Sequence, residues 1–278
     1  MLEQITPLIL TYNEAPNIGR TLEALRWARE IVVVDSFSDD ETVEIASSFP
    51  QVRAFQRAFD SHRNQWEFGL RETGIRTEWV LALDADYVLT HDAVSELKNL
   101  AAGSAVAGYR AKFTYCVHGK QLRSGIYPPV TVLYRREAAS YVQDGHTHRV
   151  VVDGRVEELR SRLLHDDRKP LRRWFTSQAR YAELEGEKLL TTSREALDLT
   201  DRVRSWLRLC CVAPAATLFY CLFVRGGIFY GWRGLYYAFQ RALAELMLSL
   251  YLLEARCIFS ESTPITAMLP RQSSKTAD

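Results

Sequence analysis

Three apolar runs in the first part of the chain each end on polar or acidic side chains, and this pattern limits the fold more than any other feature. The runs are residues 5–10, 31–34 and 79–83. The second is entirely β-branched and does not alternate, which is typical of a strand buried on both faces of a parallel sheet. Helical patterns follow at about 17–29 and 41–47. We therefore expect an α/β fold with a mainly parallel, Rossmann-like sheet flanked by helices, its strand ends meeting at one edge.

Two carboxylates, Asp84 and Asp86, follow the third run. In an extended chain residues i and i+2 share a face, so both side chains are expected to point into the crevice beyond the strand's carboxyl end. Hard divalent cations such as Mg²⁺ and Mn²⁺ prefer oxygen ligands of this kind. A capped turn is the alternative explanation for an Asp-x-Asp triplet.

Four short motifs occur in order along the first 86 residues. They are Thr11-Tyr12-Asn13-Glu14, Val32-Val33-Val34-Asp35-Ser36, Ser38-Asp39-x-Glu41-Thr42 and Asp84-Ala85-Asp86. Their order and spacing resemble the nucleotide-diphospho-sugar half of a family-2, GT-A type glycosyltransferase over roughly residues 4–170. Within that family the chain most resembles the bacterial branch that adds sugars to lipopolysaccharide core, exopolysaccharide or other glycolipids.

The resemblance implies a GT-A nucleotide-diphospho-sugar transferase fold and a reaction. The expected reaction is inverting, metal-dependent transfer of a single sugar from a UDP-linked donor to a lipid-linked or cell-envelope glycan acceptor. The Gln-x-x-Arg-Trp motif of processive synthases is absent, which favours one sugar per visit.

The resemblance also assigns donor-binding residues at the first two strand ends. Thr11, Asn13 and Glu14 are expected to line the pocket for base and ribose, with Asp35 supplying a carboxylate and Asp39 nearby. Turn and N-cap roles are the structural alternatives for such side chains.

For the diphosphate and metal, the resemblance makes Asp86 the direct ligand of Mg²⁺ or Mn²⁺ and turns Asp84 toward the sugar or ribose. His165 falls where such enzymes often place a late histidine that helps hold metal or diphosphate, a packed edge histidine being the alternative. Arg63, followed by Asn64 at an expected helix start, is assigned to phosphate or base. The alternative for Arg63 is an ordinary surface arginine.

The general base stays open between two residues. The resembling branch usually supplies it from a His-Glu pair, but here His148 is followed by Arg149. Asp144 is a nearby carboxylate, and His146 has an unperturbed pKa near working pH. The departure at Arg149 also keeps an alternative function open, a catalytically inactive GT-A relative that binds nucleotide or membrane.

The carboxy-terminal third changes character near residue 205, where apolar and aromatic blocks cover 209–224, 228–239 and 242–255. The first block has sixteen uncharged residues, which is short of the roughly 20 that a spanning helix needs. We expect a GT-A domain over 1–170, a helical membrane-associating region over 171–260 and a disordered tail over 261–278. A helical cap against the catalytic domain or another subunit is the alternative.

Composition adds limits on partners and compartment. The net charge is +1, so nothing global indicates nucleic acid as a partner. Five cysteines without a Cys-x-x-Cys pair indicate a reducing compartment, and no secretory signal is visible. We expect the protein at the cytoplasmic side of the inner membrane, peripheral or partly embedded. The basic cluster at 165–175 fits either a solvated helix start or a contact with anionic membrane or phosphate.

Overall fold

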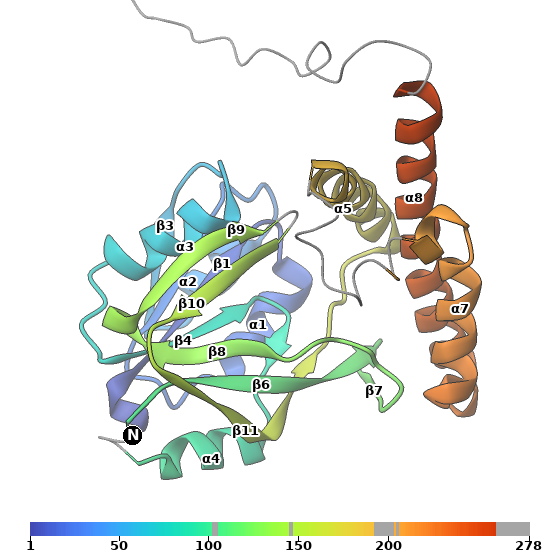
Figure 1. Ribbon diagram of the computed structural model, residues 1–278. Coiled ribbons are helices and arrows are strands. Elements are labelled where there is room, and N and C mark those ends of the chain that lie inside the picture. Colours follow the sequence, from blue (N-terminus) through green and yellow to red (C-terminus); the bar gives the residue numbers. More distant parts are fainter. Residues whose placement is uncertain (102–104, 145–146, 192–202, 204–205, 260–278) are drawn as a thin grey trace, which may run out of the picture.

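The structure is a computed structural model that describes residues 1–101, 105–144, 147–191, 203 and 206–259 (Figure 1). Its strands are β1 (Ile5–Thr11), β2 (Ile31–Asp35), β3 (Val52–Gln56), β4 (Trp79–Asp84), β5 (Tyr87–Val88), β6 (Val106–Val117), β7 (Lys120–Leu122), β8 (Val130–Arg135), β9 (Ala139–Asp144), β10 (Thr147–Val152) and β11 (Arg155–His165). Its α-helices are α1 (Ala15–Glu23), α2 (Thr42–Ser47), α3 (His62–Arg71), α4 (His91–Asn99), α5 (Leu171–Thr191), α7 (Ala213–Phe219) and α8 (Trp232–Phe259). Between α7 and α8 lie a π-helical turn, η3 (Tyr220–Val224), and a 3-10 turn, η4 (Gly227–Tyr230).

The central sheet has nine strands in the order β3-β2-β1-β4-β8-β6-β11-β5, with β7 attached to β6. Strands β1 to β4 run parallel, β8 is reversed, and β6 and β11 run in the direction of β4. The carboxyl ends of β1, β2, β4, β6 and β11 therefore meet at one edge. The expected mainly parallel α/β sheet is confirmed, and β9 and β10 form a separate hairpin.

The continuous apolar strands are buried on both faces, as the lack of alternation predicted. Ile9 and Val33 point into a core shared with α1, α2 and α4. Their neighbours Leu8 and Val32 point into a second core with α3 and the β9–β10 hairpin. Apolar side chains on successive residues are thus required on these strands, because successive residues face opposite sides of the sheet.

Two element boundaries differ from the sequence prediction. The helix expected over 17–29 ends at Glu23, because the chain tightens there into i→i+3 bonds, from Leu25 N to Leu22 O and from Ala28 N to Leu25 O. The second and third apolar blocks, expected to be separate, form the single helix α8 from Trp232 onward.

The carboxy-terminal helices pack together beyond the carboxyl end of β6 (Figure 1). Cys221 and Tyr237 share a small core with Val117 and Leu122 of β6 and β7, and α5 packs on α8. The helical content expected over 171–260 is confirmed for the described part, while the division at residue 170 and the tail 261–278, which lies outside the described residues, stay predictions. Among the described helices, none has the length and apolar character needed to cross a bilayer.

A close approach between α5 and α8 depends on Gly186. A Cβ added there would lie 2.2 Å from Cδ1 of Tyr251, whereas one added at Gly19 of α1 would meet Ile45 Cγ2 at an ordinary 3.5 Å. We expect Gly186→Ala to lower the free energy of unfolding by about 1–3 kcal/mol through overpacking. The matched variant Gly19→Ala should raise it by up to about 1 kcal/mol through helix propensity. Thermal and denaturant unfolding measure both, and a stabilised Gly186→Ala protein would contradict the packing of α5 on α8.

Candidate active site

The register of the three central strands brings the predicted residues to one edge. Thr11 on β1 is paired with Asp35 on β2, and Leu10 of β1 is paired with Asp84 on β4. The two strand-end carboxylates therefore flank β1 on either side. This edge gathers the side chains that the sequence predicted for the donor.

The loops after β1 and β2 are locked together by the Asp35 carboxylate, which is 1% exposed. Its Oδ1 accepts hydrogen bonds from Thr11 Oγ1 (2.9 Å) and Ser38 Oγ (2.5 Å), and its Oδ2 accepts one from Ser38 N (2.8 Å). Asn13, at a positive φ of 56°, donates from its backbone N to Ser38 Oγ (2.7 Å), and its Oδ1 accepts from Asp39 N (2.8 Å). Thr11, Asn13 and Asp35 thus build the loop platform, and their direct contact with a donor stays a prediction.

The sequence left two roles open for Asp39, a ligand contact and a structural turn or cap, and the structure gives the structural role to Asp40. The Asp39 side chain is exposed. Asp40 instead accepts from Ala15 N (3.2 Å) and from both the N (3.0 Å) and the Oγ1 of Thr42. Asp40 is therefore the structural carboxylate, and the one next to it is free to meet a ligand.

Asp86 and His165 come together because β5 pairs antiparallel with β11, placing Tyr87 beside His165. His165 Nε2 lies 3.2 Å from Asp86 Oδ2. Burial alone would raise the pKa of Asp86, but His165 and Lys169 outweigh it and lower that pKa to about 2. Burial alone would lower the pKa of His165, and Asp86 raises it instead. The carboxylate is therefore held charged in a buried position.

The chemistry of this pair fits a divalent cation. Asp86 is 8% exposed, its Oδ1 is buried without a hydrogen-bond partner, and so is Nδ1 of His165. In the described part of the chain, no three His, Cys, Asp or Glu side chains cluster as a complete ligand set. Mg²⁺ is usually bound by one or two carboxylates together with substrate phosphates and waters, so a single strong carboxylate is compatible with a metal that arrives with a diphosphate.

Tyrosines that the sequence analysis did not single out surround this centre. Asp84 accepts a hydrogen bond from Tyr87, whose hydroxyl lies 2.6 Å from that of Tyr127. The rings of Tyr87, Tyr115 and Tyr127 stand edge-on to the His165 imidazole, with centroids 5.4, 4.9 and 4.4 Å away. Burial, with the Asp86 charge, raises the pKa of Asp84 to about 6. The tyrosines fix the orientation of Asp84 and His165, and no short sequence motif marks them.

The loop that carries Tyr127 is held by the carboxy-terminal helices. Arg123 N donates to the hydroxyl of Tyr230 (3.2 Å), and Ile126 N donates to that of Tyr237 (2.9 Å). These contacts span more than a hundred residues of sequence. The helical region therefore takes part in shaping the site.

A partly buried ion pair joins the first strand end to the segment after β11. Lys169 Nζ lies 2.5 Å from Glu14 Oε1, and Asn17 Nδ2 donates to Glu14 Oε2 (2.8 Å) and to Asp167 Oδ1 (2.9 Å). Burial alone would lower the pKa of Lys169, but Glu14, Asp86 and Asp167 raise it. Neither explanation for the basic cluster, a solvated helix start or a contact with membrane or phosphate, describes Lys169, whose partners are this protein's own carboxylates.

Arg63 is exposed on the first turn of α3. Gln65, two residues later, is buried and donates from Nε2 to Ser36 Oγ (2.8 Å), directly after Asp35. Because residues two apart on a helix lie about 200° apart around its axis, the side of α3 that faces the β2 end is that of Gln65. The phosphate or base role of Arg63 stays a prediction, and Gln65 is a residue of the site edge that the sequence analysis missed.

The side chains of Asp144 and His146, the two candidates for the general base, are not described by the structure. His146 and the side chain of Asp144 lie outside the described residues. The backbone of Arg149 pairs with Val142 in the β9–β10 hairpin, and its side chain is exposed.

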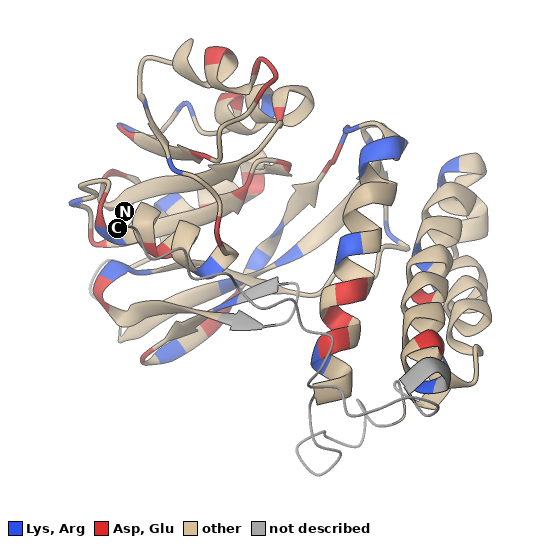
Figure 2. Cartoon of the chain, turned by 90° about the horizontal axis from the view of Figure 1, so that it is seen from above, with Lys and Arg blue, Asp and Glu red and all other residues tan. Residues whose placement is uncertain are grey.

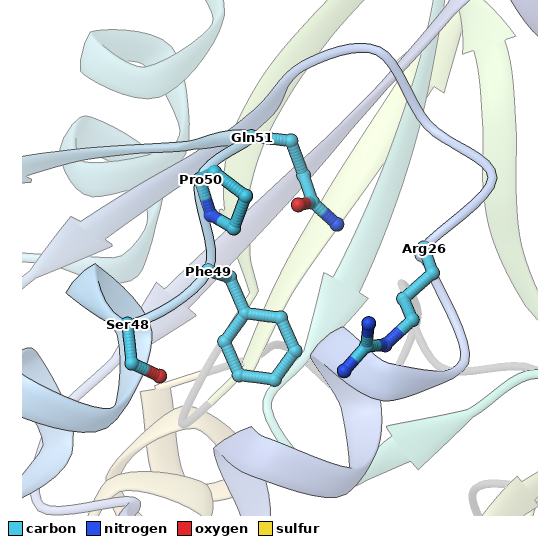
Figure 3. A pocket seen from close by; sticks show the side chains of 5 residues that line it. All are labelled: Arg26, Ser48, Phe49, Pro50 and Gln51. Atoms are coloured by element: carbon cyan, nitrogen blue, oxygen red, sulfur yellow. The ribbon is translucent and has the colours of Figure 1, made fainter.

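A separate pocket of ≈ 400 Å³ lies at the other edge of the sheet, beside the start of β3 (Figure 3). It is lined by Arg26, Ser48, Phe49, Pro50 and Gln51. The Arg26 guanidinium stands 5.8 Å from the centre of the Phe49 ring. With one cation, no carboxylate and a position at the strand starts, this pocket lacks the chemistry found at the carboxyl edge.

Family comparison agrees with the site at that edge. Residues 8–152 match the family described as Glycosyl transferase family 2. This stretch covers more than half of the chain and contains all four motifs, so the chain belongs to glycosyl transferase family 2. Together with the sheet, this confirms the expected GT-A class.

Individual relatives agree at the level of the family. An uncharacterized glycosyltransferase of Rickettsia bellii is 30% identical over 161 residues, 55% of this chain and 53% of that protein. The lipopolysaccharide core biosynthesis glycosyltransferase LpsC of Rhizobium meliloti is 30% identical over 112 residues, 38% of this chain and 40% of that protein. The chain spans about half the length, or less, of these relatives.

Solved structures resemble the chain more distantly. Staphylococcus aureus TarS with UDP-GlcNAc gives a TM-score of 0.47 at 12% identity, covering 92% of each chain. Mycobacterium tuberculosis glucosyl-3-phosphoglycerate synthase with Mn²⁺, UDP and phosphoglyceric acid gives 0.43 at 16% identity, covering 64% of this chain and 76% of that one. Likeness at this level carries no argument about substrate.

Proposed function

We propose that the protein transfers one sugar from a nucleotide diphosphate donor, taken to be uridine-linked, to a lipid-linked or cell-envelope glycan acceptor, with inversion and with Mg²⁺ or Mn²⁺. The observation that carries the proposal is the buried, charged Asp86, with an unpartnered oxygen beside His165 at the edge where the donor motifs meet. The lipopolysaccharide-core relative supports the class of acceptor. The motif resemblance supports the uridine nucleotide.

In this proposal the acceptor oxygen forms a bond to the anomeric carbon while the bond from that carbon to the diphosphate breaks. The diphosphate leaves with the electron pair, and the acceptor proton passes to a base that stays open between Asp144 and His146. A divalent cation held by Asp86 and His165 would neutralise charge on the leaving diphosphate. Asp84, oriented by Tyr87, would hold a hydroxyl of the sugar or ribose.

Calorimetry with a panel of nucleotide sugars tests the proposal. Titrations of UDP-, GDP-, dTDP- and CMP-sugars into the full chain, with Mn²⁺ or with EDTA, should show binding of the uridine compounds that requires the metal. Binding of another nucleotide class would correct the donor. An absence of metal-dependent binding to all four would contradict the proposed function.

A further inference from the structure

The outer face of the carboxy-terminal helices is apolar although their inner face is already packed. The inner side is occupied by the contacts with β6, β7 and α5. Of the 21 large hydrophobic side chains exposed in the described part of the chain, 11 belong to residues 219–250 of this region. We call them the aromatic surface: Phe219, Tyr220, Phe223, Val224, Ile228, Phe229, Trp232, Leu235, Phe239, Leu246 and Leu250.

The members on α8 form one stripe. Trp232, Leu235, Phe239, Leu246 and Leu250 follow one another at intervals of three, four, seven and four residues, which keeps them on one side of a helix with 3.6 residues per turn. The stripe is about 27 Å long. It extends the surface formed by η3 and η4, where Phe229 is 89% exposed.

The two sequence segments that form the η4 end of the aromatic surface carry charges of one sign. Residues 97–136 and 206–244 contain Lys and Arg but no Asp or Glu. Arg225 donates to the carbonyl oxygens of Arg123 (3.3 Å) and Gly125 (3.1 Å), so that these segments adjoin. The Arg233 guanidinium lies 4.6 Å from the centre of the Trp232 ring. In Figure 2 the outer helices at the right are mostly tan, whereas α5 beside them carries many charges of both signs.

We propose that the aromatic surface docks into the headgroup layer of an anionic lipid bilayer. Aromatic rings beside arginines suit the level of the headgroups, and basic groups near the surface add attraction to anionic lipids. A second copy of the chain fits less well, because a two-fold interface at this end would gather Arg123, Arg225 and Arg233 of both copies with no carboxylate from these segments between them.

Docking would also place the catalytic edge near the membrane, because the same helices hold the loop of Tyr127 through Tyr230 and Tyr237. This placement of the catalytic edge rests on the proposed function, since it matters for catalysis only if the acceptor is linked to a membrane lipid. The lipid interaction itself needs no sugar transfer. The two proposals can therefore fail separately.

Vesicle flotation of the full chain tests the docking. The wild type should float with phosphatidylcholine vesicles that contain phosphatidylglycerol, more weakly at high salt, and much less with pure phosphatidylcholine. Phe223→Ser/Phe229→Ser should partition at least about tenfold more weakly. Arg123→Gln/Arg233→Gln should lose the preference for anionic vesicles.

The matched control is Val151→Ser/Phe175→Ser, which removes two side chains, each 42% exposed, outside the aromatic surface. It should float like the wild type, and thermal unfolding should show all variants folded. Equal flotation of Phe223→Ser/Phe229→Ser and wild type, or no flotation of the wild type, would overturn the docking. So would light scattering that shows a dimer which this double variant disrupts. Intact UDP binding alongside lost flotation would leave the proposed function standing.

Discussion

Replacing Asp86 with asparagine is expected to weaken Mn²⁺-dependent binding of UDP by at least about 100-fold. Substitution of a residue that merely supports a metal ligand typically costs about 10–100-fold in metal affinity, and Asp86 is expected to be the ligand itself. Asparagine keeps the size of the side chain but removes the negative charge that His165 and Lys169 hold in place. UDP calorimetry in Mn²⁺ and in EDTA separates the metal-dependent part of the affinity.

The matched control is Asp92→Asn, which removes an exposed carboxylate from the first turn of α4. It should bind UDP like the wild type in both buffers. If Asp86→Asn binds UDP in Mn²⁺ as tightly as the wild type does, Asp86 is not the metal ligand. A folded protein is checked by its unfolding transition, because Asp86 is buried and also contacts His165.

Removing one partner of the Glu14–Lys169 pair should produce the largest loss of stability from a single charge substitution. The side chains are 14% and 20% exposed, and Lys169→Met leaves Glu14 buried beside Asp86 without its cation. Breaking a fully buried pair in this way typically costs about 3–5 kcal/mol, and this pair, being partly exposed, is expected at the low end of that range. We expect a loss of about 3 kcal/mol in the free energy of unfolding, measured with denaturant.

A double-mutant cycle shows whether the loss belongs to the pair. Glu14→Gln/Lys169→Met should lose at least about 1 kcal/mol less than the sum of the single variants, because the double variant leaves neither member of the pair charged without the other. Arg29→Met serves as the control: it breaks a pair with Glu3 whose side chains are both 73% exposed. Its effect should stay within about 1 kcal/mol. Additive losses at Glu14 and Lys169 would show that the two side chains act independently.

The strands and the shared edge could be predicted because each depends on local sequence. A run such as Ile31–Val34 must be buried on both sides, and parallel strands must bring Asp35 and Asp84 to the same edge. The order of motifs then identified the family. The pattern could not distinguish a ligand-binding carboxylate from a structural one. Asp35 lies at the predicted place, yet both of its carboxylate oxygens accept hydrogen bonds from Thr11 or Ser38.

The missed residues depend on long-range pairing. Tyr87 and Tyr127 reach Asp84 and His165 only because β5 joins β11 and the loop after β7 folds back. Lys169 meets Glu14 across 155 residues of sequence. No local periodicity encodes such contacts. The available signal was the pair of aspartates followed by two basic residues at 166–169, which indicated paired charges without identifying their partners.

The hydrogen bonds from the loop of Tyr127 to Tyr230 and Tyr237 affect how the two parts of the chain can be recombined in evolution. The family match ends at residue 152, yet a wall of the site is fastened by residues 230 and 237. Recombination between relatives at the end of the matched region would separate that wall from its fastening. The catalytic half and the carboxy-terminal helices are therefore expected to be exchanged together. A chimera that joins this catalytic half to the helices of another protein would keep the loops after β1 and β2 but lose the shape of the site around Tyr127.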